Sequence, residues 1–135
     1  MKKSLFLLIP VLALVFLASC SKEDTPAPPA ATPQGTWIGT GQYGTGAGSP
    51  TYPFTLTFKA NGTVDIVGNN SAATENATGT WAIVADSVKA SYTYPSSSAI
   101  YALSGKFSSN SNVMNGTIGL SPATAGVGLF SVTRQ

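Results

Sequence analysis

Hydrophobic and polar residues alternate along much of the chain from Gly35 onward. This period of two is typical of β-strands that bury one face and leave the other in water. Thr, Ser, Val and Tyr are abundant there, and no stretch repeats its apolar residues with helical spacing. The pattern predicts strands that begin near Gly35 and then cover residues 54–59, 63–67, 79–84, 87–94, 101–107, 114–120 and 127–134.

The connections between these predicted strands are short. Asn61-Gly62 is the strongest signal, because both residues tolerate the positive φ angles of a tight hairpin. Eight strands joined in sequence form an antiparallel meander, and closing it into an up-and-down barrel removes its two unpaired edges. Charged residues make up only 9% of the chain, so few lysines are available to protect an open edge. We therefore expect an all-β fold, an eight-stranded antiparallel barrel over residues 35–135.

A short repeat lies within the predicted barrel. Gly-Thr-Trp occurs at residues 35–37 and again at residues 79–81. The spacing also fits one blade of a β-propeller, but a propeller needs at least about four blades and the chain is too short for them. The repeat instead suggests corresponding strands in two halves of one barrel.

The segment before Cys20 has a different pattern. Lys2 and Lys3 precede an apolar run from Leu5 to Ala18, which is shorter than the roughly 20 residues of a bilayer-spanning helix. Leu-Ala-Ser-Cys at residues 17–20 follows and resembles the lipobox of bacterial lipoproteins. The resemblance implies that residues 1–19 are a signal peptide and that Cys20 carries the acyl chains of a membrane anchor. The alternative is an ordinary cleaved signal peptide with Cys20 just inside the mature chain.

Residues 20–34 are expected to link the anchor to the barrel. The stretch from Thr25 to Gln34 is rich in proline, which favours extended polyproline II and gives a semi-rigid spacer of roughly 3 Å per residue. In enterobacterial lipoproteins an aspartate directly after the cysteine signals retention in the inner membrane, and Ser21 stands there in this chain. The resemblance to lipoproteins therefore implies the outer membrane of the cell envelope as the location. Lys22-Glu23-Asp24 is similar to the surface-export signal of Bacteroidetes lipoproteins, but it also fits a simple polar tether. The face of the membrane is left open.

The composition excludes several classes of function. The formal charge of +2 arises from Lys2 and Lys3, so the rest of the chain lacks the basic surplus that nucleic-acid binding needs. Histidine is absent and the single cysteine belongs to the lipobox, which removes zinc sites and the usual nucleophilic triads. The acidic residues of the predicted barrel are interpreted as solvated surface charges. We expect no enzyme, no cofactor and no metal. These acidic residues are Asp65, Glu75 and Asp86.

Several short motifs carry a family resemblance. Gly-Thr-Trp at 35–37 and 79–81, and Phe-x-Leu-x-Phe-x-x-Asn-Gly-Thr-Val at 54–64, look like the lipocalin-like domains of Bacteroidetes lipoproteins. Gly116-Thr117 and the segment Phe-Ser-Val at 130–132 are similar to the last two strands of that family. The resemblance covers about residues 35–135 and implies a lipocalin-like barrel.

The contents of the lumen decide between two functions. Nine aromatic residues are expected to point inward, enough to fill a small barrel, whereas several glycines at inward positions would leave a partial cavity. A cavity would be apolar, with tyrosine hydroxyls orienting a small hydrophobic ligand. The candidate ligand-binding residues are Tyr92, Tyr94, Tyr101 and Trp81, and the glycines are Gly105, Gly116, Gly126 and Gly128.

A filled barrel would instead suit a structural or surface-interaction module, such as a coat or adhesion protein. Asp86-Ser87-Val88 matches the O-glycosylation pattern of Bacteroidetes, so Ser87 is a candidate modification site. In either case the predicted partners are the membrane, through the acyl chains on Cys20, and at most a small ligand. We expect a monomer.

Overall fold

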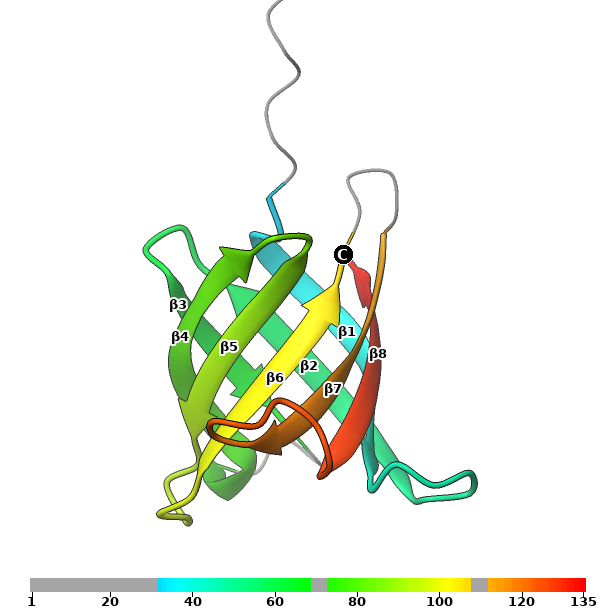
Figure 1. The fold of residues 1–135 in the computed structure, drawn as a ribbon. Helices are drawn as coiled ribbons and strands as arrows, with labels where there is room; N and C mark the ends of the chain where they lie inside the picture. The colour runs from blue at the N-terminus through cyan, green and yellow to red at the C-terminus, as the bar shows by residue number, and fades with distance from the viewer. Residues whose placement is uncertain (1–31, 69–72, 108–111) are drawn as a thin grey trace, which may run out of the picture.

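The computed structural model describes residues 32–68, 73–107 and 112–135, and it confirms the predicted fold. Eight antiparallel strands pair in sequential order and close into one barrel (Figure 1). The leader, Cys20 and most of the linker lie outside the described residues. The strands are β1 (Gly35–Tyr43), β2 (Thr51–Phe58), β3 (Thr63–Val67), β4 (Asn76–Val84), β5 (Ser87–Thr93), β6 (Ile100–Lys106), β7 (Val113–Leu120) and β8 (Gly128–Arg134).

Pairing between the first and last strands closes the barrel. The β1–β8 ladder runs from Trp37 opposite Arg134 to Tyr43 opposite Gly128. Neither strand is therefore left with a free edge, as the low charge of the sequence requires. No helix among the described residues is long and apolar enough to cross a membrane.

The predicted loop from Gly68 to Thr78 is shorter than expected. A single 3-10 turn, η2 (Ala73–Glu75), precedes β4, which already pairs with β3 at Asn76 and buries Ala77. The inward positions at the start of β4 hold Ala77 and Gly79, and these small residues weaken the alternation that reveals a strand.

The hairpin at Asn61-Gly62 forms where it was predicted, but with a different turn. Positive φ occurs only at Gly62, at 80°. Asn61 instead uses its side chain, whose Oδ1 accepts hydrogen bonds from the backbone N–H of Thr63 at 3.1 Å and from its hydroxyl at 2.6 Å. Lys59 donates its backbone N–H to the Thr63 carbonyl at 2.9 Å. This is the longer hairpin that ends in a glycine bulge.

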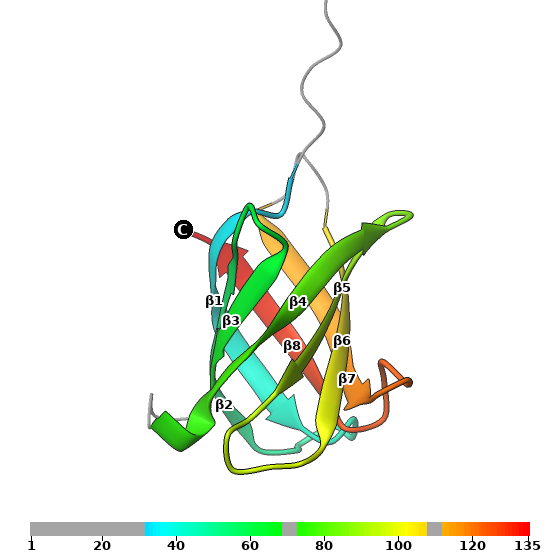
Figure 2. The same ribbon diagram turned by 90° about the vertical axis from the view of Figure 1, so that its left-hand side faces the viewer.

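The two ends of the barrel differ, and we call them the terminal end and the mouth. Residue 32 and Gln135 lie together at the terminal end, uppermost in Figures 1 and 2, with the hairpins at 59–62 and 85–86. Trp37 is buried there and donates its indole N–H to the Pro33 carbonyl at 2.7 Å. The guanidinium of Arg134 lies over the Trp37 ring, 5.1 Å from its centre. These contacts fill the terminal end.

The middle of the lumen is packed with side chains. Its glycines make room for large neighbours: a Cβ at Gly105 would lie 2.8 Å from the Phe130 ring and 2.9 Å from the Met114 sulfur. The expectation that Gly105 and Gly116 leave a cavity is therefore wrong. The buried core comprises Trp37, Phe54, Leu56, Phe58, Val64, Ile66, Ala77, Val88, Ala90, Tyr92, Leu103, Met114, Ile118, Phe130 and Val132.

The interpretation of the Gly-Thr-Trp repeat is also wrong. The two copies lie on β1 and β4, which are three strands apart and so run in opposite directions. They do not mark equivalent strands of two half-barrels. What they share is the hydrogen bond of the indole, because Trp81 also donates its N–H to a backbone carbonyl, that of Lys59, at 3.0 Å.

Candidate functional site

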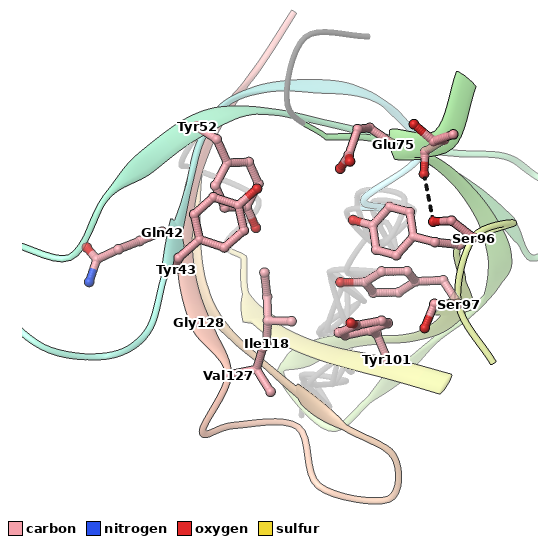
Figure 3. Close-up of a pocket in the computed structure, with 13 residues that line it drawn as sticks. Gln42, Tyr43, Tyr52, Glu75, Ser96, Ser97, Tyr101, Ile118, Val127 and Gly128 are labelled. Atoms are coloured by element: carbon pink, nitrogen blue, oxygen red, sulfur yellow. Dashed lines mark hydrogen bonds between the residues drawn. The ribbon is translucent and has the colours of Figure 1, made fainter. Parts of the chain in front are cut away.

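The mouth of the barrel holds a cavity of about 300 Å³. All five tyrosines of the chain line it. Four of them lie on four different strands, and the fifth, Tyr94, directly follows β5. The remaining lining is mostly small and polar, with Ile118 as its apolar floor (Figure 3). The tyrosines are Tyr43, Tyr52, Tyr92, Tyr94 and Tyr101.

The tyrosines form two groups that face each other. Tyr43 and Tyr52 pack together with ring centres 4.3 Å apart, and Figure 3 shows them on the wall opposite Tyr101. On the Tyr101 side, Tyr92 is stacked on Tyr101 at 5.7 Å and Tyr94 meets both rings edge-on at 5.5–5.6 Å. Such offset and edge-to-face contacts are the favoured arrangements of aromatic pairs.

Barrel closure explains this opposition. Tyr43 ends β1 and Tyr52 is the second residue of β2, so both lie where that hairpin turns at the mouth. Tyr92 and Tyr101 are directly paired across β5 and β6, again next to a turn at the mouth. In a closed barrel of eight strands, β1 and β2 lie across the lumen from β5 and β6. The ladder pairing thus brings residues distant in sequence around one space.

Glu75 adds a carboxylate to this cavity. It ends the 3-10 turn before β4, and in Figure 3 its carboxylate points into the space between the tyrosine groups. A Cβ added to Gly68 would lie 3.5 Å from Glu75 Oε2 and 3.6 Å from the Tyr94 hydroxyl, so these two oxygens approach the same point. The structure thus places Glu75, which the sequence suggested is a solvated surface charge, half-buried at the mouth of the cavity.

The other two acidic side chains lie elsewhere. Asp65 forms an exposed ion pair with Lys59, at 2.6 Å between Oδ2 and Nζ, and Asp86 forms one with Lys106 at 3.2 Å. Both are solvated surface charges, as predicted. No lysine or arginine in the described part of the chain forms an ion pair with Glu75. Glu75 is the one charged side chain that lines the cavity.

The environment of the cavity raises the pKa of three of its phenols, those of Tyr52, Tyr92 and Tyr94. Burial raises the pKa of Tyr52 and Tyr92 above the ordinary value, and neighbouring tyrosines raise it further. For Tyr94, burial and then the negative field of Glu75 raise the pKa to about 12. A buried phenol is harder to ionise because its anion loses hydration and meets like charge. Three phenols of the cavity are thus partly withdrawn from water, and Glu75 makes the local field negative for Tyr52 and Tyr94.

Three of the four predicted ligand-binding residues meet in this site, and one does not. Tyr92, Tyr94 and Tyr101 line the cavity, whereas Trp81 lies nearer the terminal end and packs against Phe58 at 5.5 Å between ring centres. Trp81 does not line this cavity, because β4 runs from the mouth toward the terminal end and carries Trp81 away from the tyrosines. Tyr43, Tyr52 and Glu75 were missed as site residues. Of the four glycines, Gly128 does line the cavity.

The remaining site predictions fall outside the cavity. Ser87 lies at the terminal end, next to the β4–β5 turn, is half-buried, and donates its hydroxyl to Asp86 Oδ1 at 3.0 Å. Cys20 lies outside the described residues. Within the described ranges, no group of three or more Cys, His, Asp or Glu side chains could hold a metal ion.

Neither a protein-family model, nor a curated protein, nor a solved structure matches this chain.

Proposed function

We propose that the protein is a lipid-anchored protein of the cell envelope whose barrel binds a small molecule in the tyrosine-lined cavity. The observation that carries this proposal is the gathering of all five tyrosines around one open space of about 300 Å³ in a barrel that is otherwise packed. That volume lies at the lower limit of small-molecule sites, which are typically about 300–1,000 Å³. The ligand is therefore small, with an apolar surface against the rings and polar contacts to the phenols.

The anchor rests on the sequence of the leader. The lipobox at residues 17–20, the proline-rich linker and the resemblance to lipocalin-like lipoproteins of Bacteroidetes agree on a tethered barrel. Two or three acyl chains on Cys20 would hold the protein on a membrane, since each buried methylene contributes roughly 0.8 kcal/mol. In this proposal the barrel is monomeric, non-catalytic and placed at the outer membrane.

The second candidate function is a structural or surface-interaction module. It is favoured by the packed middle of the lumen, where a Cβ at Gly105 would already overlap Phe130. A module of this kind has no use for a cavity, so an open mouth lined by all five tyrosines argues for ligand binding instead. Blocking the mouth separates the two functions, because it should abolish binding by a ligand-binding barrel and should leave a surface-interaction module unchanged.

Native mass spectrometry of the full chain, released from a neutral detergent, tests the binding proposal. The protein is incubated with a lipid and metabolite extract of the source envelope, and a saturable small-molecule adduct is expected. Val127→Trp places a bulky ring at the mouth and should abolish the adduct. Val84→Trp makes the same change at an exposed site at the terminal end and should leave the adduct unchanged. An adduct that survives Val127→Trp would contradict binding in the cavity.

The anchor is tested separately with the full chain expressed in a bacterium fed an alkyne-tagged fatty acid. The wild type should incorporate the tag and sediment with membranes. Cys20→Ser should lose both properties. An untagged protein in the soluble fraction would support the ordinary cleaved signal peptide instead.

A further inference from the structure

We propose that the ligand of this cavity is an organic cation, an alkylated ammonium group held by the tyrosine faces and by the carboxylate of Glu75. This inference rests on the proposed function, because it names the chemical class of the small molecule. It goes beyond an apolar ligand in assigning a positive charge to the part that enters the mouth.

The arrangement of rings is the first support. Tyr43 and Tyr52 stand on one wall, while Tyr92, Tyr94 and Tyr101 stand on the other with ring centres 5.5–5.7 Å apart and mixed stacked and edge-on orientations. The rings of both walls border one space that opens at the mouth, and Figure 3 shows the hydroxyl ends of Tyr43, Tyr52 and Tyr101 directed into it. The face of an aromatic ring is negative and attracts a cation within about 6 Å, most strongly where water is excluded. Several rings around one space form an aromatic cage.

The distribution of charge is the second support. Glu75 is the one charged side chain lining the cavity, and it points into the space between the rings. The basic side chains of the described residues lie away from the mouth: Lys59, Lys106 and Arg134 are at the terminal end, and Lys89 is exposed on the outer face of β5. A positive ligand would thus supply a counter-charge that the described chain does not. An anionic ligand would meet repulsion with no compensating partner.

The phenols respond to the same field. The negative charge of Glu75 contributes to the raised pKa of both Tyr52 and Tyr94, which stand on opposite walls. Its field therefore extends across the cavity. A cation between the walls would interact favourably with the carboxylate and with every neighbouring ring at once.

The size of the cavity and the hydration of the ligand narrow the class of cation that can bind. A cavity of about 300 Å³ accommodates a small ammonium group with a short substituent. Its lining offers one carboxylate and Ser, Thr and Tyr hydroxyls, so a strongly hydrated inorganic cation would lose more hydration than these groups replace. Alkylated ammonium groups are weakly hydrated and match apolar ring faces.

Calorimetric titration of the full chain in a neutral detergent tests this inference. The probes are choline and 3,3-dimethyl-1-butanol, which have the same shape but differ in charge. We expect choline to bind at least about tenfold more tightly than the neutral isostere. Glycerophosphocholine distinguishes a free cation from a lipid headgroup. We expect it to bind more weakly than choline, because its phosphate is repelled by Glu75, and tighter binding would assign a headgroup as the source of the ammonium.

Three variants locate the interaction. Glu75→Gln keeps the shape of the side chain and should weaken choline binding roughly tenfold while leaving the weak binding of the isostere unchanged. Asp86→Asn removes a carboxylate at the other end of the barrel and should have no effect, which controls for net charge. Tyr43 is half-exposed, so it can be changed without disturbing the core: Tyr43→Leu should weaken choline binding severalfold, and Tyr43→Phe should preserve it.

The outcomes separate this inference from the proposed function. Equal affinity for choline and its isostere, both lost in Val127→Trp, would overturn the cationic ligand but leave a binding cavity in place. An equal loss of choline binding in Glu75→Gln and Asp86→Asn would also overturn the inference, since only general electrostatics would remain. No binding of either probe, together with no adduct from the envelope extract, would overturn both.

Discussion

At the scale of single residues, the two tryptophans of the repeated Gly-Thr-Trp motif show how burial sets the value of one contact. Both donate the indole N–H to a backbone carbonyl, at 2.7 Å for Trp37 and 3.0 Å for Trp81. The Trp37 bond is buried and that of Trp81 is exposed to water. A lost buried hydrogen bond leaves the partner carbonyl unsatisfied, whereas an exposed carbonyl is hydrated again.

We therefore expect Trp37→Phe to lower the free energy of unfolding by about 2–3 kcal/mol and Trp81→Phe by about 1 kcal/mol. Urea unfolding followed by circular dichroism measures both. Equal losses would show that the two indole N–H groups contribute alike and that burial does not separate them.

The tyrosine cavity makes a second residue-scale prediction. A phenol whose pKa is higher in the folded than in the unfolded chain stabilises the fold fully below the unfolded value, here 10.0, and that stability is lost as the pH rises further. The free energy of unfolding should thus be level up to about pH 9 and fall between pH 10 and the Tyr94 value of about 12.

Absorbance of tyrosinate checks this directly, since the native protein should ionise later than the chain in concentrated urea. Tyr94→Phe should remove part of the delay. Coincident titration curves for the native and unfolded protein would contradict the buried, negative site.

At the scale of elements, glycines set how closely neighbouring strands approach. A Cβ at Gly79 would overlap the carbonyl of Ser91 on β5, which is backbone and has no rotamer to change. Gly79→Ala should therefore destabilise the barrel by about 1–3 kcal/mol. Gly46, in the β1–β2 loop, has its nearest neighbour at 3.6 Å, so Gly46→Ala should change stability by less than about 0.5 kcal/mol. Thermal unfolding of the pair measures the difference, and equal midpoints would contradict it.

The strand pattern in the sequence predicted part of the site. The alternation in β5 and β6 placed Tyr92, Tyr94 and Tyr101 on one face, and they do lie together because adjacent strands of a hairpin share a face. Tyr43 and Tyr52 join them through closure of the whole barrel, which no local pattern encodes. The sequence did hold a signal for Tyr43. It lies an even number of positions after Trp37 on the same strand, so the two side chains point to the same, inward face. Trp81 could have been excluded by following the direction of β4 along the barrel axis.

At the scale of the whole molecule, closure predicts uniform protection of the backbone. The β1–β8 ladder spans Trp37 to Tyr43 and is as continuous as the ladders within hairpins. Amide hydrogen exchange should therefore be as slow along the paired residues of β1 and β8 as along those of β4 and β5. Rapid exchange confined to β1 and β8 would indicate an open sheet whose first and last strands are edges.

Closure was predictable because a weakly charged meander has few means to protect two edges. The position of Glu75 was not predictable from the sequence. Glu75 lies in a connection between strands, so the alternation of inward and outward residues does not say where its side chain points. Its place over the mouth depends on the length of the turn at Ala73–Glu75 and on the early start of β4.

The shared position of residue 32 and Gln135 has a practical consequence for measurement. A fluorophore, an affinity tag or a sensor surface attached through Gln135 would stand at the far end of the barrel from the tyrosines. The domain would then be displayed with its cavity facing the sample, so immobilised protein should report ligand affinity without obstruction. The same geometry makes the barrel a ready scaffold for an oriented small-molecule sensor.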